Sequence, residues 1–276
     1  MTAVATLHYD YLRQVVFSLS HNVLDPSRDY LFETRLARLL RHQGMTQLEE
    51  LVERLRECHN PELERAVAEA MTINETSFFR DLRPFELLRN ELLPQIVKAR
   101  QSTRTLRMWS AACSTGQETY SLAMLVRELN PALVGWNVQI EGTDLTCAMV
   151  ERAKSGRYHR IEINRGLPAR CVVRYFEHHG EEWVVKPELR ELCRFRSLNL
   201  CKPPLPFMGR FDVILLRNVM LYLSQETRRD LMRNVHRLLA PDGVLMLGST
   251  EQPAEDGMWQ SVLAGGTCYF RPKSTG

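Results

Sequence analysis

The sequence lacks the features that would place the chain in a membrane or in a disulfide-bonded fold. Its 276 residues contain no run of about 18 consecutive apolar residues, which a membrane-spanning helix needs. The seven cysteines are an odd number without a CxxC pair, which argues against disulfide frameworks and zinc sites and indicates a reducing cytoplasm. The segment Met1 to Tyr11 has neither the basic start nor the apolar middle of a signal peptide, so we expect none.

A strong excess of one charge is also missing. The chain has 36 Lys and Arg against 33 Asp and Glu, a net charge of +3. This value is too small to indicate a nucleic-acid-binding protein, so a helix-turn-helix interpretation of the first helices is disfavoured, and any basic patch must be local. Hydrophobic residues make up 44% of the chain and charged residues 25%, values that are typical of a globular protein with a real core.

The first part of the chain has helical patterning. Asp29 could cap a helix over residues 30–42, and Thr46 could cap the next one, with Glu49 completing a capping box. No strand-like alternation competes with this pattern. We therefore predict a small all-helical N-terminal domain over residues 1–83.

From residue 84 to residue 276, strand-like and helical segments alternate, which predicts an α/β fold. The alternation is typical of a doubly wound, mostly parallel sheet with helices on both faces. Residues 172–195 break the rhythm with three short β-like pieces, which we interpret as a small antiparallel β insert. The expected strands are Thr105–Ser110, Val138–Gly142, Phe211–Leu216 and Gly243–Gly248, and the expected helices are Arg83–Arg100, Gln117–Leu129, Thr146–Lys154 and Gln225–Leu239.

Ligands of such sheets bind at the carboxyl ends of the strands. The small residues of Ala111–Glu118 would let a ligand approach the backbone, although the loop lacks GxGxxG and a simple tight turn is the competing interpretation. Asp144 could accept hydrogen bonds from ribose hydroxyls or cap the following helix. Asn199 could bind an adenine edge or belong to a turn. The polar pair Arg217-Asn218 follows the most apolar strand, where core residues do not explain it.

These segments, together with Asn74–Arg80, resemble the CheR family of chemotaxis receptor methyltransferases. The family patterns NxTxFFR, WSAxxSTGEExYS, TD and RNVxxY are matched in order by Asn74–Arg80, Trp109–Ser121, Thr143-Asp144 and Arg217–Tyr222. Ser249-Thr250-Glu251 also fits the family, and the likeness spans residues 10 to 272. Three positions depart from the pattern, with Gln117 in place of glutamate, Thr119 in place of proline and Cys113 in place of alanine.

The resemblance implies a Rossmann-like fold that binds S-adenosyl-L-methionine and releases S-adenosyl-L-homocysteine. It implies Arg80 and Tyr222 as catalytic residues, and no metal. On the N-terminal domain, the basic residues Arg35, Arg38 and Arg41 are implied to meet the substrate, whereas a solvated helix face is the bland alternative. The implied cofactor-binding residues are Asn74, Thr76, Arg80, Ala111, Glu118, Asp144, Asn199, Leu200, Asn218 and Val219.

The implied reaction is O-methylation of glutamate side chains on the cytoplasmic helical region of chemoreceptors, which gives methyl esters for sensory adaptation. A glutamate carboxylate, with a reference pKa of about 4.3, is already ionised at pH 7, so no general base is needed. The enzyme is expected to act as a monomer in the cytoplasm. Its short insert, with a tight His178-His179-Gly180 corner, disfavours a receptor peptide tether. The alternatives are methylation of another protein or a small-molecule carboxylate, and a catalytically silent cofactor-binding signalling protein.

Overall fold

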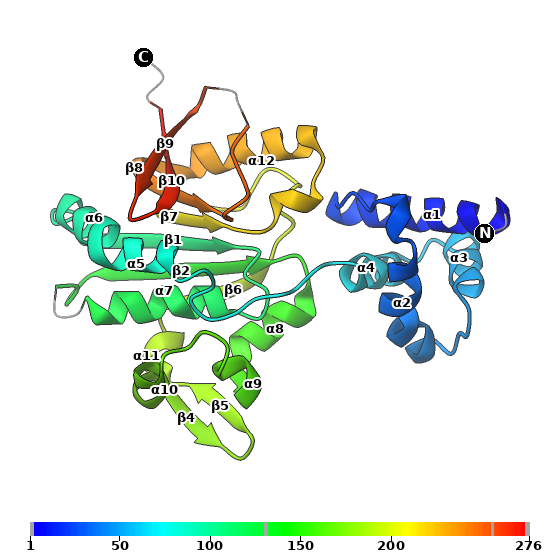
Figure 1. Cartoon of the computed structure of the whole chain (residues 1–276), viewed down its shortest axis with the longest axis horizontal. Coiled ribbons are helices and arrows are strands. Elements are labelled where there is room, and N and C mark those ends of the chain that lie inside the picture. The colour runs from blue at the N-terminus through cyan, green and yellow to red at the C-terminus, as the bar shows by residue number, and fades with distance from the viewer. Residues whose placement is uncertain (1–2, 130–131, 255–256, 274–276) are drawn as a thin grey trace. The chain divides into compact units, whose positions relative to one another are not determined.

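A computed structural model of the chain describes residues 3–129, 132–254 and 257–273 (Figure 1). The chain divides into two compact units, residues 1–73 with 220–228, and residues 74–219 with 229–276. Compared with the predicted division after residue 83, the segment 74–83 is grouped with the sheet-bearing unit. Within the described residues, none of the helices has the length and apolar character needed to cross a bilayer. The ends of the two predicted domains, residues 1–2 and 274–276, lie outside the described residues.

The first unit is all-helical, as the sequence predicts. Its amphipathic helices turn one apolar stripe inward, because burying that stripe is what stabilises a short helix in water. The buried core includes Leu12, Val16, Phe32, Leu36 and Leu51. The elements are α1 (Ala3–Ser20), η1 (Pro26–Arg28), α2 (Tyr30–His42), α3 (Leu48–Glu57), α4 (Pro61–Ala70) and the 3-10 turn η3 (Met220–Tyr222).

Of the two predicted helix caps, one lies at its expected position and the other does not. Asp29 is the N-cap residue of α2 but makes no side-chain cap bond. Its carboxylate instead accepts a hydrogen bond from the Arg13 guanidinium. The Thr46 hydroxyl donates to Glu50 at 2.7 Å rather than pairing with Glu49. The reason is that Gln47 is the N-cap of α3, which makes Glu50 the third helical residue, the position that a capping box uses.

The second unit confirms the predicted doubly wound α/β fold. A seven-stranded sheet has the order β6-β2-β1-β7-β8-β10-β9. The first five strands in this order are parallel, and β10 pairs antiparallel with both β8 and β9. The strands are β1 (Thr105–Ala111), β2 (Asn137–Asp144), β6 (Cys193–Ser197), β7 (Phe211–Leu216), β8 (Leu239–Leu247), β9 (Trp259–Ala264) and β10 (Thr267–Pro272).

Helices cover both faces of the large sheet. Figure 1 shows α12 (Gln225–Leu238) on one side of it and α7 (Gln117–Glu128) on the other. The helix α8 (Cys147–Ser155) follows β2. The single helix expected from Arg83 to Arg100 is divided into α5 (Arg83–Leu87), a π-helical turn η2 (Leu88–Leu92) and α6 (Leu93–Ala99). Pro94 explains the division, because proline lacks the N–H that a regular helix needs at that place.

A second, antiparallel sheet has the order β3-β5-β4. The predicted insert range 172–195 contains β4 (Phe176–His179) and β5 (Glu182–Val185), whereas β3 (Arg157–His159) precedes it. The third β-like piece in that range belongs to β6 of the large sheet. Close packing favours this pairing, because a Cβ at Gly142 of β2 would lie 2.6 Å from the Phe195 ring of β6. The short helices α9 (Arg160–Ile163), α10 (Ala169–Tyr175) and α11 (Pro187–Arg190) lie along the chain between these strands.

The hairpin β9–β10 was not predicted, although the sequence carries a signal for it. Gly265 and Gly266 join the two strands and have φ values of +54° and +69°. A two-residue loop with two left-handed residues is the turn that suits the twist of a hairpin. A Gly-Gly pair between two runs rich in aromatic and β-branched residues therefore indicates this element.

Arg100 links the end of the α6 segment to the sheet. Its Nε donates to Asp212 at 2.7 Å, and its other guanidinium nitrogens donate to Asp242 at 2.8 and 2.6 Å. The Asp212 side chain is buried, and its second oxygen accepts from the backbone N–H of Arg107 at 2.8 Å. The hydrogen bonds from Arg100 lower the pKa of Asp242.

We expect Arg100→Met to lower the free energy of unfolding by about 2–3 kcal/mol, because the buried Asp212 loses its cation. The contribution of Asp242 exists above the ordinary carboxyl pKa and is lost as pH falls through its lowered value. Urea unfolding from pH 7 to pH 3 should therefore show a steeper acid loss in the wild type than in the variant. Arg104→Met, at an exposed side chain, is the control. Equal stability of the two variants would contradict the prediction.

Candidate active site

The loop after β1 bends sharply at the carboxyl end of the sheet. Ala112, Ser114 and Gly116 have φ values of +59°, +50° and +94°. The N–H of Cys113 donates to the Thr143 carbonyl at 2.8 Å, which ties the loop to β2. At Gly116 a Cβ would lie 2.9 Å from the Ala153 Cβ, so only glycine fits between the loop and α8. The loop is thus a tight turn that also keeps its backbone close to the strand ends.

Asp144 joins this loop to the start of α8. Its side chain is buried, and its carboxylate accepts from the N–H of Ser114 at 2.8 Å and from the N–H of Thr146 at 3.0 Å. The N-cap of α8 is Thr146, so Asp144 is not the cap residue itself. The Asp144 carboxylate therefore ties the loop after β1 to the start of α8.

Arg217 connects three segments of the site. It directly follows β7, and its side chain is only 2% exposed. It donates to the Glu118 carboxylate at 3.1 Å, to Asp81 at 2.5 Å and to the carbonyl of Arg80 at 3.0 Å. Glu118 also accepts from the Ser110 hydroxyl at 2.7 Å. The sequence marked Arg217 as unusual after an apolar strand, but gave it no role among the site residues. The structure shows that it fixes Glu118 and the backbone at Arg80.

Glu251 holds the ends of two neighbouring strands together. It is 4% exposed, and its carboxylate accepts from the N–H groups of Asn218 and Gly248, each at 2.7 Å, and of Val219 at 2.9 Å. Asn218 has a φ of +60°, so the turn after β7 is left-handed. Glu251 was not among the predicted site residues. The sequence signal that could have identified it is an acid placed four residues after an apolar strand.

The segment that carries Arg80 is anchored on both sides. The Asn74 carbonyl accepts from the Ser114 hydroxyl at 2.8 Å, and the N–H of Phe79 donates to the Ser121 hydroxyl at 3.0 Å. Phe78 is fully buried, so it belongs to the core. Thr76 is half-buried.

The backbone around Arg80 is strained. Phe79, Asp81 and Leu82 have φ values of +47°, +65° and +38°, which are costly for residues other than glycine. Such strain persists only where the surroundings enforce it, and it concentrates at functional sites. The half-buried Arg80 side chain donates to the Glu75 carbonyl at 2.9 Å.

The predicted adenine residues lie beside Asp144, since the N–H of Leu198 donates to the Asp144 carbonyl at 2.8 Å. The Asn199 side chain accepts from the N–H of Cys201 at 2.9 Å, which is the turn interpretation of this residue. Leu200 is buried. The structure brings these residues together with the strand-end carboxylates, and their binding roles stay predictions.

The predicted substrate arginines differ in their surroundings. Arg35 is half-buried and donates to the Met71 carbonyl at 2.8 Å, whereas Arg38 and Arg41 are exposed. Tyr222 belongs to η3, which is grouped with the helical unit, and its carbonyl accepts from the N–H of Val23 at 2.8 Å. Because Arg80 belongs to the other unit, the joint action of these two side chains stays a prediction.

The thiol in the loop after β1 gives a chemical test of how tightly that loop is packed. Burial raises the pKa of Cys113 well above its ordinary value. Because the thiolate is the reactive form, we expect iodoacetamide to modify the exposed Cys58 and Cys147 far faster than Cys113, as followed by mass spectrometry. Equal labelling rates would show that the loop opens readily.

Comparison with known proteins identifies the family. Residues 74–266 match the CheR methyltransferase, SAM binding domain, and residues 7–72 match the CheR methyltransferase, all-alpha domain. The chain is 42% identical over 233 residues to chemotaxis protein methyltransferase 1 of Pseudomonas aeruginosa, covering 83% of this chain and 84% of that protein. It is 37% identical over 253 residues to chemotaxis protein methyltransferase Cher2 of Pseudomonas putida, covering 90% and 91%. It is 33% identical over 255 residues to chemotaxis protein methyltransferase of Escherichia coli, covering 90% and 85%.

The residues at the strand ends fit the cofactor of this family. S-adenosyl-L-methionine offers hydroxyl and ammonium donors. The carboxylates of the buried Asp144 and of Glu118, whose side chain is 12% exposed, are hydrogen-bond acceptors beside a loop that stays close to the strands. The chain therefore belongs to the CheR family of methyltransferases and uses S-adenosyl-L-methionine as its methyl donor.

Proposed function

We propose that the enzyme methylates glutamate side chains on the cytoplasmic helical region of chemoreceptors. The product is a glutamyl methyl ester, which would serve sensory adaptation. The names of the related proteins connect them with chemotaxis, and this chain covers most of their length. The all-helical unit with its exposed arginines supports a macromolecular substrate of negative charge.

The chemistry of the strand ends carries the choice of a carboxylate as acceptor. Among the described residues, Glu118, Asp144 and Glu251 are acids of this region, and each already accepts hydrogen bonds from an arginine, a hydroxyl or backbone N–H groups. Acids engaged in this way are poorly placed to take a proton from an alcohol or an amine. A glutamate carboxylate needs no deprotonation at pH 7, because its reference pKa is about 4.3.

The work of the protein in this reaction is then positioning and exclusion of water. The bound cofactor supplies a methyl group that its sulfonium has already activated. Asp144 would hold the ribose and Glu118 the ammonium group. Arg80 would orient the acceptor carboxylate, and Tyr222 would donate a hydrogen bond to the oxygen that does not attack. Asn199, Leu200, Asn218 and Val219 would complete the cofactor site, with Asn74, Thr76 and Ala111 at its edge.

A transfer assay with receptor cytoplasmic fragments tests the proposal. The fragments are incubated with the enzyme and methyl-labelled cofactor, and the label is then released with mild base. Esters hydrolyse under these conditions and N-methyl groups do not, so base-labile label on wild-type fragments, lost when the acceptor glutamates are changed to alanine, is the expected result. Label on another protein or on a small carboxylate alone would favour the alternative substrates.

The exposed Arg38 and Arg41 give a further prediction. If they steer an acidic substrate, transfer to the receptor fragment should fall about tenfold when salt is raised from about 50 mM to about 500 mM, because ions screen exposed charges. The affinity for S-adenosyl-L-homocysteine, measured in parallel, reports any effect of salt on the cofactor site itself. Equal transfer rates at both salt concentrations would contradict the steering role.

A further inference from the structure

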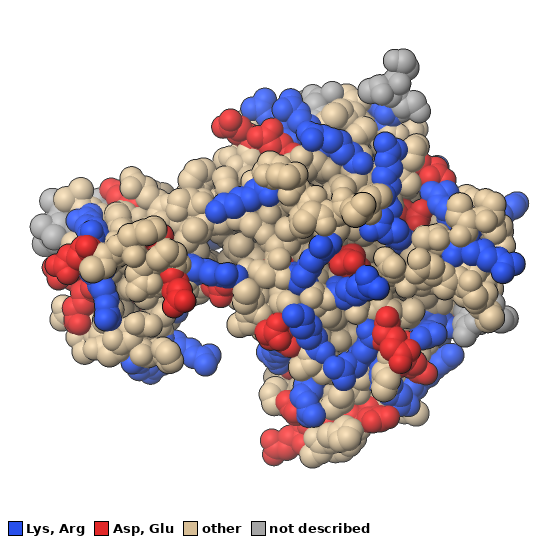
Figure 2. Space-filling view, turned by 180° about the vertical axis from the view of Figure 1, so that it is seen from behind, with Lys and Arg blue, Asp and Glu red and all other residues tan. Residues whose placement is uncertain are grey.

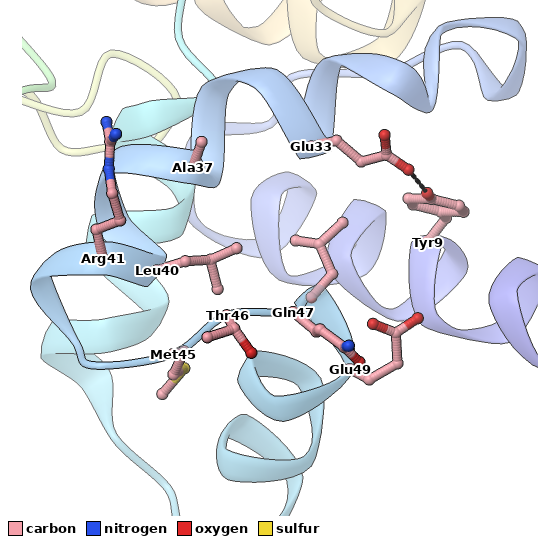
Figure 3. A pocket seen from close by; sticks show the side chains of 10 residues that line it. Tyr9, Glu33, Ala37, Leu40, Arg41, Met45, Thr46, Gln47 and Glu49 are labelled. Atoms are coloured by element: carbon pink, nitrogen blue, oxygen red, sulfur yellow. Dashed lines mark hydrogen bonds between the residues drawn. The ribbon is translucent and has the colours of Figure 1, made fainter.

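Among the described residues of the helical unit, three of the pockets differ in the charges that line them. The first, of about 540 Å³, is lined by Glu33 and Glu49 against one cation, Arg41. Figure 3 shows Glu33 accepting the hydrogen bond of Tyr9, while the Arg41 guanidinium points away from this pair. This pocket would repel an anion.

The second pocket, of about 630 Å³, contains Arg13 and Arg56. Both are already engaged, because Arg13 pairs with Asp10 at 2.5 Å and also with Asp29, and the Arg56 guanidinium lies 4.8 Å from the centre of the Tyr11 ring. Arg13 is therefore not free for a ligand, and Arg56 is held against the Tyr11 ring.

The third pocket, of about 360 Å³, combines an excess of positive charge with an apolar rim. Its polar lining includes Arg28, Arg35 and Tyr222, and its single acid is Asp25. The Asp25 carboxylate accepts from the N–H of Ser27 at 2.8 Å. The exposed Arg28 forms no ion pair within the part of the chain that the structure describes. Hydrogen bonds from Ser27, and after them the nearby charge of Arg28, lower the pKa of Asp25. With two arginines against one acid, the pocket keeps an excess of positive charge.

The apolar part of the rim is unusually exposed for its residue types. Val23, Ile73 and Leu221 are 53%, 44% and 46% exposed, and all three line this pocket. Phe32 and Met71, which are buried, also line it. Exposed apolar side chains that gather around one hollow are typical of a binding site, whereas scattered ones are not.

Segments far apart in the sequence build this pocket within one unit. Asn22 forms an antiparallel bridge with Leu223, and the N–H of Val23 donates to the Tyr222 carbonyl at 2.8 Å. The N–H of Arg28 donates to the Asp25 carbonyl at 2.9 Å, which fixes the turn that presents Arg28. The backbone on both sides of the pocket is thus held in place, and Tyr222 belongs to its wall.

An apolar stem that ends in an anion is the ligand that this lining fits. A glutamate side chain has this form, with two methylene groups and a carboxylate. Resting on the proposed function, we propose that the pocket binds a second acidic side chain of the substrate helix, near the glutamate that is methylated. Arg28 is the specificity residue for that carboxylate, and Val23, Ile73 and Leu221 contact its methylene groups.

Kinetics with paired variants test this inference. In the receptor fragment, each acidic residue near an acceptor glutamate is changed singly to glutamine. One such change should raise the KM of the wild-type enzyme about tenfold, as expected for one lost charged hydrogen bond, with little change in kcat. Arg28→Ala should raise the KM for the unchanged fragment by a similar factor. The KM of this variant should then rise no further when the same glutamine is present in the fragment. Arg54→Ala removes an exposed arginine of α3 and serves as the matched control, with an unchanged KM.

Reversing the charge at Arg28 and at its partner position in the receptor fragment is a second test. Arg28→Glu should bind the unchanged fragment more weakly than Arg28→Ala does, and lysine at the sensitive receptor position should restore its KM. If Arg28→Ala and the glutamine change raise KM independently, so that their factors multiply in the combination, the pocket assignment is overturned. An unchanged KM in Arg28→Ala would overturn it too. If the wild-type enzyme leaves no base-labile methyl on any fragment, the proposed function itself fails, and this outcome is separate from a wild type that is active but shows no role for Arg28.

Discussion

Arg80→Ala is expected to lower kcat/KM for the receptor fragment by about 10²–10³-fold or more, because a misplaced reactant loses the benefit of alignment. The structure supports a positioning role for this residue. Left-handed backbone at Phe79 and Asp81 flanks it, and Arg217 holds its carbonyl at 3.0 Å. Initial rates with labelled cofactor, measured at saturating cofactor, are the readout.

Phe78→Leu, two residues away, separates catalysis from stability. Phe78 is fully buried, with ring centroids 5.0 Å from Tyr158 and 5.7 Å from Phe176. We expect this variant to lose about 1–2 kcal/mol of unfolding free energy and to keep its kcat, since the substitution mainly removes packing. Wild-type transfer by Arg80→Ala would refute the catalytic assignment.

Glu251→Gln is expected to have the second large effect, lowering the free energy of unfolding by about 3 kcal/mol. The Glu251 carboxylate accepts three backbone N–H groups, and an amide in its place presents an NH₂ donor to at least one of them. The turn at Asn218 and Val219 should loosen with it. Because these residues are predicted to contact the cofactor, the affinity for S-adenosyl-L-homocysteine should fall at least tenfold.

Urea unfolding and calorimetric titration measure these two effects. Glu226→Gln makes the same chemical change at an exposed residue in the first turn of α12, and it should alter neither quantity by more than the experimental error. If Glu251→Gln matched this control, the buried carboxylate would not be holding the two strand ends together.

Most of the elements were predictable because their patterns are local. The strand Phe211–Leu216 is recognisable because five of its six residues are apolar, and all six, Asp212 included, are buried in the sheet. The helix Gln117–Leu129 was expected almost at its observed bounds. The predicted capping box failed by one residue, because the start of α3 depends on packing around Leu48 as well as on the local signal.

The small sheet could not be predicted fully from local sequence patterns. Its strand β3 pairs with β5 across more than twenty residues of sequence, as in the register of Tyr158 with Trp183. Three residues are too short to give a recognisable alternation, so only the pairing partner reveals the strand. The same limit placed Cys193–Phe195 in the insert, although its partner is β2 of the large sheet.

The sequence by itself determined the helical N-terminal part, the doubly wound sheet and the strand ends at which the site lies, since these follow from periodicity and from motifs in order. Only the tertiary structure decided which charges are engaged. Arg217 meets Glu118 from 99 positions away and Glu251 meets Asn218 from 33, while Arg35 donates to Met71 and Arg28 lines a pocket with Tyr222. Hydrogen bonds act over about 3 Å of space, and one-dimensional spacing holds no record of which distant groups the folded chain brings within that reach.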